Sequence, residues 1–350
     1  MKKDCEIAKN VEIQFLRIIA CFFVIVNHTN SVIFKSSDIS VTWFISLVYF
    51  YISKVAVPIF IMISGYTLLH KEDSWSKTFK RFLRILICLI LFSFVYYLNY
   101  LGTEQYPTFN ILQFFTTIWN KQITTAFWYL YLYMGIILML PFLQKVSKIM
   151  AKKDFHILFA VSLIVFGILP IIEHYFPQLK LCRYFEIPIF TTSICLMFIG
   201  EYFYRYFKKN KNVFLLSICI CMFMQMFNVV ATYYEYIKSN GENYLFFENR
   251  NLAPNVITAV CIFYIVFCLK DKIDSLSNSI KKSFIYIGDC TFGIYLLSDL
   301  IRAESLWIYK EISAGMYCMF AMLIYQCFVF ITGLAIVSLL KLVPGIKKII

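Results

Sequence analysis

The sequence is built from long apolar runs that are separated by short polar segments. A helix of about 20 apolar residues crosses the hydrocarbon core of a bilayer. The runs lie at residues 11–34, 43–69, 82–101, 126–143, 155–172, 185–207, 213–233, 253–269, 284–301 and 316–340. They lack the period-two alternation of outer-membrane strands, and only a helix satisfies its own backbone in lipid. We therefore expect an all-α polytopic integral membrane protein with about ten transmembrane helices.

The composition excludes an ordinary soluble domain. Of the 350 residues, 61% are hydrophobic and 15% are charged, whereas about a quarter of the residues in soluble domains are charged. Ten spans of about 20 residues leave too little chain for a separate globular domain. We expect residues 1–350 to form one membrane domain. Its first run is too long for a signal-peptide core, so we expect it to stay as an uncleaved span.

The distribution of basic residues predicts the orientation. With the N-terminus in the cytoplasm, the inner segments hold 24 Lys and Arg residues and the outer loops hold 8. Cytoplasmic loops carry such an excess, so we expect both termini in the cytoplasm and a multi-pass protein of the cell (cytoplasmic) membrane. The net charge of +13 resides in these short clusters, which argues against nucleic acid as a partner. The 12 cysteines form no CxxC pair, so we expect neither a disulfide framework nor a metal site.

Ionisable residues at membrane depth are the first candidates for function, because placing them there is costly. Arg17 lies near the inner end of the first run, and His28 follows eleven residues later. On a helix this spacing puts both side chains on one face, roughly 16 Å apart along the axis. Arg17 is either part of a functional stripe or a topology anchor. His28 is either a hydrogen-bonded bundle residue or a group that moves a proton near neutral pH.

Four further charged residues stand out. Arg81 and Arg84 open the third run and share one helix face. With Arg17 they could bind an anionic cytoplasmic ligand, since guanidinium groups bind phosphate in a bidentate manner; the alternative is two more topology arginines. Lys54 either lines a cavity or reaches for the membrane interface. For Glu201 we expect a salt bridge to an inner arginine.

Common catalytic templates find little support. No HExxH or HxxxH spacing and no Gly-rich loop before a Lys-Ser/Thr pair occurs, which leaves zinc hydrolysis and P-loop chemistry unsupported. The segment Ser64-Gly65-Tyr66 closes the second run and offers two hydroxyls. Helix packing through the glycine is the favoured interpretation of this segment.

Taken in order, these residues make the chain resemble the integral-membrane acyltransferases of the acyltransferase 3 family. The similarity covers essentially the whole chain. The matching segments are Arg17 to His28, Val57 to Tyr66 with its Ser-Gly-Tyr end, Arg81-Phe-Leu-Arg84, Phe127-Trp128-Tyr129-Leu130, and Cys290 to Leu296. One departure is Ser298, which stands where many members carry a histidine after Tyr-Leu-x.

The resemblance implies an enzyme that moves an acyl group, usually acetyl from acetyl-coenzyme A, onto a hydroxyl of a glycan in the cell envelope or capsule. On that basis we expect Arg17, Arg81 and Arg84 to bind the coenzyme A phosphates. His28 would act as general base on the acceptor hydroxyl or as a transient acyl carrier. No metal is expected. The accessory candidates are Lys54, Ser64, Tyr66, Trp128 and Glu201. Tyr66 and Trp128 are the two alternatives for the hydrogen-bond donor that would stabilise the oxyanion.

A function of another class uses the same basic motifs. A transporter or flippase of a lipid-linked glycan could hold a pyrophosphate with these arginines and perform no chemistry. His28 separates the two functions. A transferase should lose acylation with His28→Ala while still folding, whereas a transporter should accumulate substrate without turnover of acyl-coenzyme A.

Overall fold

The computed structural model describes residues 10–35, 38–180 and 191–350. Within these ranges the chain is helical and contains no β-strand. The elements are α1 (Val11–Thr29), α2 (Ser31–Lys35), α3 (Val41–Ser53), α4 (Ala56–Leu68), α5 (Trp75–Asn99), α6 (Ile111–Asn120), η1 (Thr125–Phe127), α7 (Trp128–Ile149), α8 (Lys152–Ser162), the π-helix η2 (Leu163–Ile168), α9 (Leu169–Tyr175), η3 (Pro177–Leu179), α10 (Thr192–Tyr206), α11 (Lys211–Lys238), η4 (Phe246–Glu248), α12 (Ala253–Cys268), α13 (Lys270–Asp274), α14 (Asn278–Gly315), α15 (Cys318–Leu340) and α16 (Pro344–Lys347).

The described residues contain nine helical stretches that are long and apolar enough to cross a membrane. This finding confirms the predicted all-α, polytopic class. The run expected at residues 185–207 corresponds to α10 from Thr192 onward, and residues 185–190 lie outside the described part of the chain. The division into ten spans and the sidedness therefore stay predictions. We call the predicted cytoplasmic end of the bundle the inner side and the opposite end the outer side.

Several helices are longer than the apolar runs that predicted them. The third run was expected from residue 82, but α5 begins at Trp75, where the side chain of Ser74 accepts a hydrogen bond from the Lys77 N–H. In the same way Ser277 caps α14, which extends well beyond the expected range 284–301. A capped first turn stays helical in the polar interface. Hydropathy alone therefore underestimates the helix length.

The second expected run is broken in the middle. α3 ends at Ser53 and α4 begins at Ala56, and Lys54 lies in the break. The physical reason is Pro58, which has no N–H to donate to the carbonyl of Lys54 four residues earlier. The break places a charged side chain at depth in the bundle instead of along a regular helix face.

α4 and α10 pack in direct backbone contact, and glycines make the contact possible. A Cβ atom added at Gly65 would lie 1.9 Å from the Met197 carbonyl oxygen, and one added at Gly200 would lie 1.9 Å from the Met62 carbonyl oxygen. The backbones therefore touch, as small residues allow in membrane helices. This result agrees with the packing interpretation of Ser64-Gly65-Tyr66.

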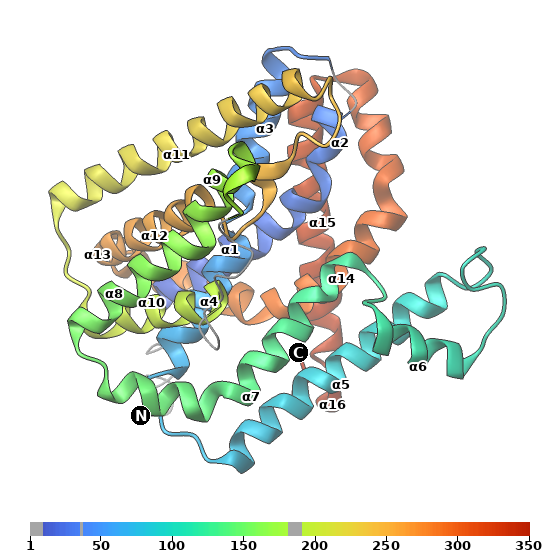
Figure 1. Ribbon diagram of the computed structural model, residues 1–350. Coiled ribbons are helices and arrows are strands. Elements are labelled where there is room, and N and C mark those ends of the chain that lie inside the picture. The colour runs from blue at the N-terminus through green and yellow to red at the C-terminus, as the bar shows by residue number, and fades with distance from the viewer. Residues whose placement is uncertain (1–9, 36–37, 181–190) are drawn as a thin grey trace.

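α1 runs through the interior of the bundle, with α14, α4, α3 and α15 packed against it. In Figure 1, α5 and α11 lie at opposite edges of the bundle, and α6 projects away on an arm that follows α5. Because α1 is central, it carries both Arg17 and His28 into the interior, where each lines a cavity.

Candidate active site

A cavity of about 590 Å³ opens in the inner half of the bundle and is rich in basic side chains. The basic residues that line it come from α1, α5, the end of α15 and the segment that follows it. They are Arg17, Arg84, Lys341, Lys347 and Lys348. Asp289 is the acidic residue in the same lining, which also includes aromatic side chains. We call this space the inner cavity. Its charge suits a polyanionic ligand.

Arg17 is held in the inner cavity by its own helix. Its Nη1 donates to the Gln14 Oε1 at 3.3 Å, one turn earlier on α1. Gln14 is buried against Gly288 of α14, where an added Cβ would lie 2.3 Å from the Gln14 Oε1. The glycine therefore makes room for the glutamine that orients the arginine.

The two arginines of α5 have different surroundings, although they lie three residues apart. Arg84 lines the inner cavity, and its Nε donates to the Ile349 carbonyl oxygen at 2.8 Å. Arg81 is instead paired with Asp73, in the loop before α5. The structure thus brings Arg17 and Arg84 to one cavity and places Arg81 in an ion pair beside it.

Asp73 organises this inner loop. Its carboxylate also pairs with the Lys77 Nζ at 2.6 Å and accepts from the Gln144 Nε2 at 3.0 Å. Burial alone would raise the pKa of the Asp73 carboxyl, but the hydrogen bonds from Lys77, Arg81 and Gln144 outweigh it and lower the pKa to about 2. The loop is therefore fixed by a carboxylate that stays charged at neutral pH.

A second cavity, of about 510 Å³, opens in the outer half and contains His28. We call it the outer cavity. Its polar lining includes Asn27 and His28 from α1, Lys54 from the break between α3 and α4, and Glu248 and Arg250 from the segment before α12. Trp128, at the start of α7, lines it as well.

The two cavities share part of their lining. Val24, Val57, Tyr129 and Tyr295 line both the inner and the outer cavity. The Tyr129 and Tyr295 rings lie edge to face with their centroids 6.0 Å apart, and the Tyr295 hydroxyl donates to the Ala126 carbonyl oxygen at 2.5 Å. We call these four residues the shared wall. Arg17 and His28, which the sequence places on one face of a helix, line cavities on opposite sides of it.

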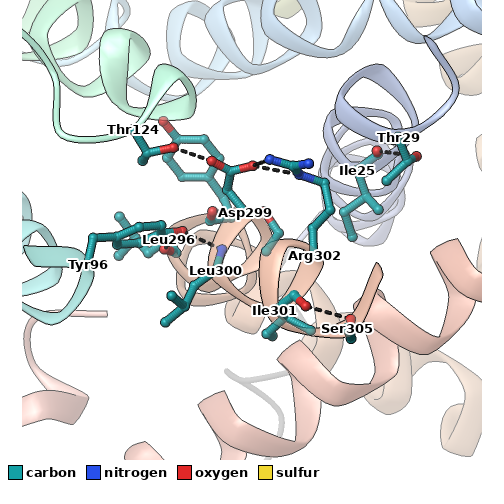
Figure 2. Close-up of polar contacts among 12 residues, drawn as sticks. Ile25, Thr29, Tyr96, Thr124, Leu296, Asp299, Leu300, Ile301, Arg302 and Ser305 are labelled. Atoms are coloured by element: carbon teal, nitrogen blue, oxygen red, sulfur yellow. Dashed lines mark hydrogen bonds and ion pairs between the residues drawn. The ribbon is translucent and has the colours of Figure 1, made fainter. Parts of the chain in front are cut away.

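A buried polar cluster on α14 adjoins the outer cavity, and sequence reasoning missed it. Asp299 accepts from the Arg302 Nε at 2.7 Å and is hydrogen-bonded by the Thr124 hydroxyl (Figure 2). Asp299 lies close enough to His28 for an electrostatic interaction between the two side chains. The signal was visible as an acid and an arginine three residues apart near the end of an apolar run, directly after Ser298. The Ser298 hydroxyl itself bonds back to the Tyr295 carbonyl.

The remaining accessory candidates have separate surroundings. Lys54 lies 3.5 Å from the Glu248 carboxylate in the outer cavity. Ser64 lines the inner cavity, and its hydroxyl donates to the Phe60 carbonyl. Tyr66 packs against Tyr204 and Phe267 in the contact of α4 with α10 and α12, so nothing places it beside His28.

Glu201 has the kind of partner that was expected. It is fully buried and pairs with the Arg205 Nε at 2.7 Å, and the Arg205 Nη2 donates to the Ser147 hydroxyl at 2.9 Å. Within the described residues no three His, Cys, Asp or Glu side chains gather as a metal site would require. The expectation that no metal takes part stays a prediction.

The chain matches one family of known proteins. The model of a family described as an acyltransferase domain matches residues 10–342. The match includes α1 with Arg17 and His28, and it extends to the end of α15. No curated protein and no solved structure matches the chain significantly.

Proposed function

Because the chain belongs to the acyltransferase domain family, which matches it over nearly its whole length, we propose a specific reaction for this membrane acyltransferase. It moves an acyl group, expected to be acetyl, from acyl-coenzyme A to a hydroxyl of a cell-envelope or capsular glycan. The donor occupies the inner cavity from the cytoplasmic side of the cell membrane. The acceptor occupies the outer cavity beside His28.

The observation that carries the proposal is the pair of cavities with a shared wall. A donor at the inner side and an acceptor at the outer side must meet within about 30 Å of hydrocarbon. Arg17 and Arg84 line the inner cavity, and His28 lines the outer cavity. Tyr129 and Tyr295 line both spaces. A transferase requires donor and acceptor sites that adjoin in this way, because the thioester and the hydroxyl must come into contact.

The inner cavity contains the cationic hydrogen-bond donors that the phosphates of coenzyme A require. Arg17 and Arg84 supply guanidinium groups, and Lys341 supplies an ammonium group that already donates to the Asp289 carbonyl oxygen at 2.8 Å. Charge-assisted hydrogen bonds of this kind hold phosphate well. For Arg81 we propose a supporting role, in which its pair with Asp73 fixes the inner end of α5.

In the outer cavity His28 activates the acceptor hydroxyl, either as general base or as acyl carrier. As general base, a neutral imidazole takes the hydroxyl proton while the oxygen forms a bond to the thioester carbonyl carbon and the carbon–sulfur bond breaks. The thiolate of coenzyme A then leaves, and the proton held by His28 passes to it, which restores the neutral imidazole. As acyl carrier, an imidazole nitrogen of His28 would instead form a bond to the thioester carbonyl carbon while the carbon–sulfur bond breaks and coenzyme A leaves. The acceptor hydroxyl would then take the acyl group in a second step and release the neutral imidazole. Both routes need His28 neutral at the moment of attack.

The test is acyl-coenzyme A turnover by purified protein in nanodiscs, with envelope glycan oligosaccharides added as acceptors. Wild type is compared with His28→Ala and Arg84→Ala, and His156→Ala serves as the matched control because that histidine contacts Tyr202 at the inner end of α8. We expect His28→Ala to bind the donor and to lose turnover by at least about 100-fold, the usual contribution of a general base. Arg84→Ala should bind the donor weakly, and His156→Ala should resemble wild type.

A second measurement, of glycan transport in proteoliposomes, distinguishes the transferase from a transporter that performs no chemistry. If wild type neither binds nor consumes any acyl-coenzyme A, and labelled lipid-linked glycan crosses proteoliposomes in its presence, the transferase proposal fails. If His28→Ala turns over the donor as fast as wild type, the role assigned to His28 is wrong.

A further inference from the structure

Arg250 is a cation of the outer cavity that the proposed reaction does not use. It lies on the segment between η4 and α12, and its guanidinium carbon is 3.8 Å from the centroid of the Trp128 ring. A guanidinium stacked on an aromatic face leaves its N–H edge available for in-plane hydrogen bonds. Trp128 therefore orients the group without consuming its donors.

The charges around Arg250 leave it without a neutralising partner. Lys54 and Glu248 face the same cavity, but they lie 3.5 Å from each other and form one ion pair. The Asp299 carboxylate is already paired with the Arg302 guanidinium. Among the residues that the structure describes, no carboxylate pairs with Arg250. The outer cavity thus carries an excess positive charge that is held in a fixed orientation.

A second polar group in this cavity also lacks a partner. The Asn27 Oδ1 is buried and has no hydrogen-bond partner among the described residues. Asn27 lines the outer cavity next to His28. A buried acceptor left unpaired destabilises the folded state. A ligand that brought an O–H or N–H group to this atom would remove that destabilisation.

From these two observations, and resting on the proposed function, we propose that the acceptor is an acidic saccharide. Its anionic group, a carboxylate or a phosphodiester, binds the N–H edge of Arg250, and one of its hydroxyl or amide groups donates to Asn27. The reacting hydroxyl then lies at His28, between these two contacts. Bidentate recognition of two oxygens favours Arg over Lys at such a position.

The experiment measures binding separately from turnover. Wild-type protein in nanodiscs is titrated calorimetrically with three matched oligosaccharides: one that contains a glucuronic acid, its carboxyl-reduced neutral counterpart, and one that carries a glycosyl phosphodiester instead. Each is also titrated into Arg250→Gln, Arg250→Lys and the control Lys121→Gln. The control removes an exposed cation at the end of α6. Lys121 is predicted to lie on the outer side of the membrane, as Arg250 is.

We expect at least one anionic oligosaccharide to bind wild type at least tenfold more tightly than the neutral one. Arg250→Gln should remove this preference by weakening the anionic ligand at least tenfold and the neutral ligand less than twofold. Arg250→Lys should restore part of it, and Lys121→Gln should keep it. Which anionic ligand binds more tightly identifies carboxylate or phosphodiester as the recognised group.

Three results would overturn the inference: equal binding of the neutral and anionic ligands, equal weakening of both by Arg250→Gln, or no binding of either anionic ligand. Equal weakening would mean that Arg250 only packs against Trp128. If the acidic ligands bind through Arg250 but never increase release of coenzyme A, recognition of an acidic saccharide by Arg250 stands, and the proposed acyl transfer to it fails.

Discussion

At the scale of single residues, the first run of the sequence located both sides of the candidate site. Arg17 and His28 were singled out by their spacing, and each lines a cavity. Asp299 and Arg250 were not found. Asp299 is linked to the site by its hydrogen bond from Thr124 and by its proximity to His28, both of which lie far away in the chain. Arg250 is linked to the site by its stacking on Trp128. Contacts between distant segments leave no periodic pattern that a single sequence could reveal.

The Asp299–Arg302 pair predicts a stability effect. Asp299 is 5% exposed and Arg302 is 29% exposed at the side chain. Asp299→Asn leaves the arginine without its carboxylate, so we expect a loss of about 3 kcal/mol and a clearly lower Tm. The double variant Asp299→Leu/Arg302→Leu removes both charges and should recover most of this loss. Thermal unfolding in detergent measures both, and a double variant less stable than Asp299→Asn would contradict the account.

Asp73 predicts an acid-dependent loss of stability. Its pKa of about 2 lies below the ordinary value of 3.8, so the folded state holds the charged form more strongly than the unfolded state does. The stabilisation, about 2 kcal/mol, is present above about pH 4 and is lost as the pH falls toward 2. Melting curves of wild type should therefore fall in this window more steeply than those of Asp73→Asn.

The control for Asp73 is Asp271→Asn. Asp271 pairs with Lys209, but its side chain is 75% exposed, and water screens such a pair. Its acid profile should follow that of wild type. Identical profiles for Asp73→Asn and wild type would show that the Asp73 contacts do not stabilise the inner loop.

At the scale of elements, hydropathy predicted where helices lie but not where they break. The apolar run at residues 43–69 was expected as one span, and the break at Lys54 follows from a missing backbone hydrogen bond at Pro58. The proline was visible in the sequence, but hydropathy does not register hydrogen bonding. The break brings Lys54 into the lining of the outer cavity.

The contact of α4 with α10 predicts the effect of a single methyl group. Gly200→Ala would place a Cβ 1.9 Å from the Met62 carbonyl oxygen. The helices must therefore separate, and we expect the free energy of unfolding to fall by about 1–3 kcal/mol or more. Gly135→Ala on α7 is the matched control, since nothing lies within 4 Å of its added Cβ. Helix propensity should make that variant neutral or slightly more stable. A Gly200→Ala variant that melts like Gly135→Ala would contradict the close contact.

At the scale of the whole molecule, the sequence predicted a polytopic bundle and its orientation but could not predict the two cavities. Long apolar runs and the distribution of Lys and Arg report on each helix separately. The packing of helices from distant parts of the chain decides which helices surround α1. The same packing brings Tyr129 and Tyr295 into the lining of both cavities. The claim that donor and acceptor meet across the shared wall therefore rests on the assembled fold.

The most direct test of this claim is a sided transfer measurement in proteoliposomes with a known orientation of the protein. Labelled acetyl-coenzyme A is supplied only on the inner side, and envelope glycan oligosaccharides, including acidic ones, only on the outer side. We predict that labelled acetyl appears on the outer glycan, that free coenzyme A stays on the inner side, and that His28→Ala abolishes the transfer. Transfer that occurs only when both substrates share one side, or that persists in His28→Ala, would contradict the account.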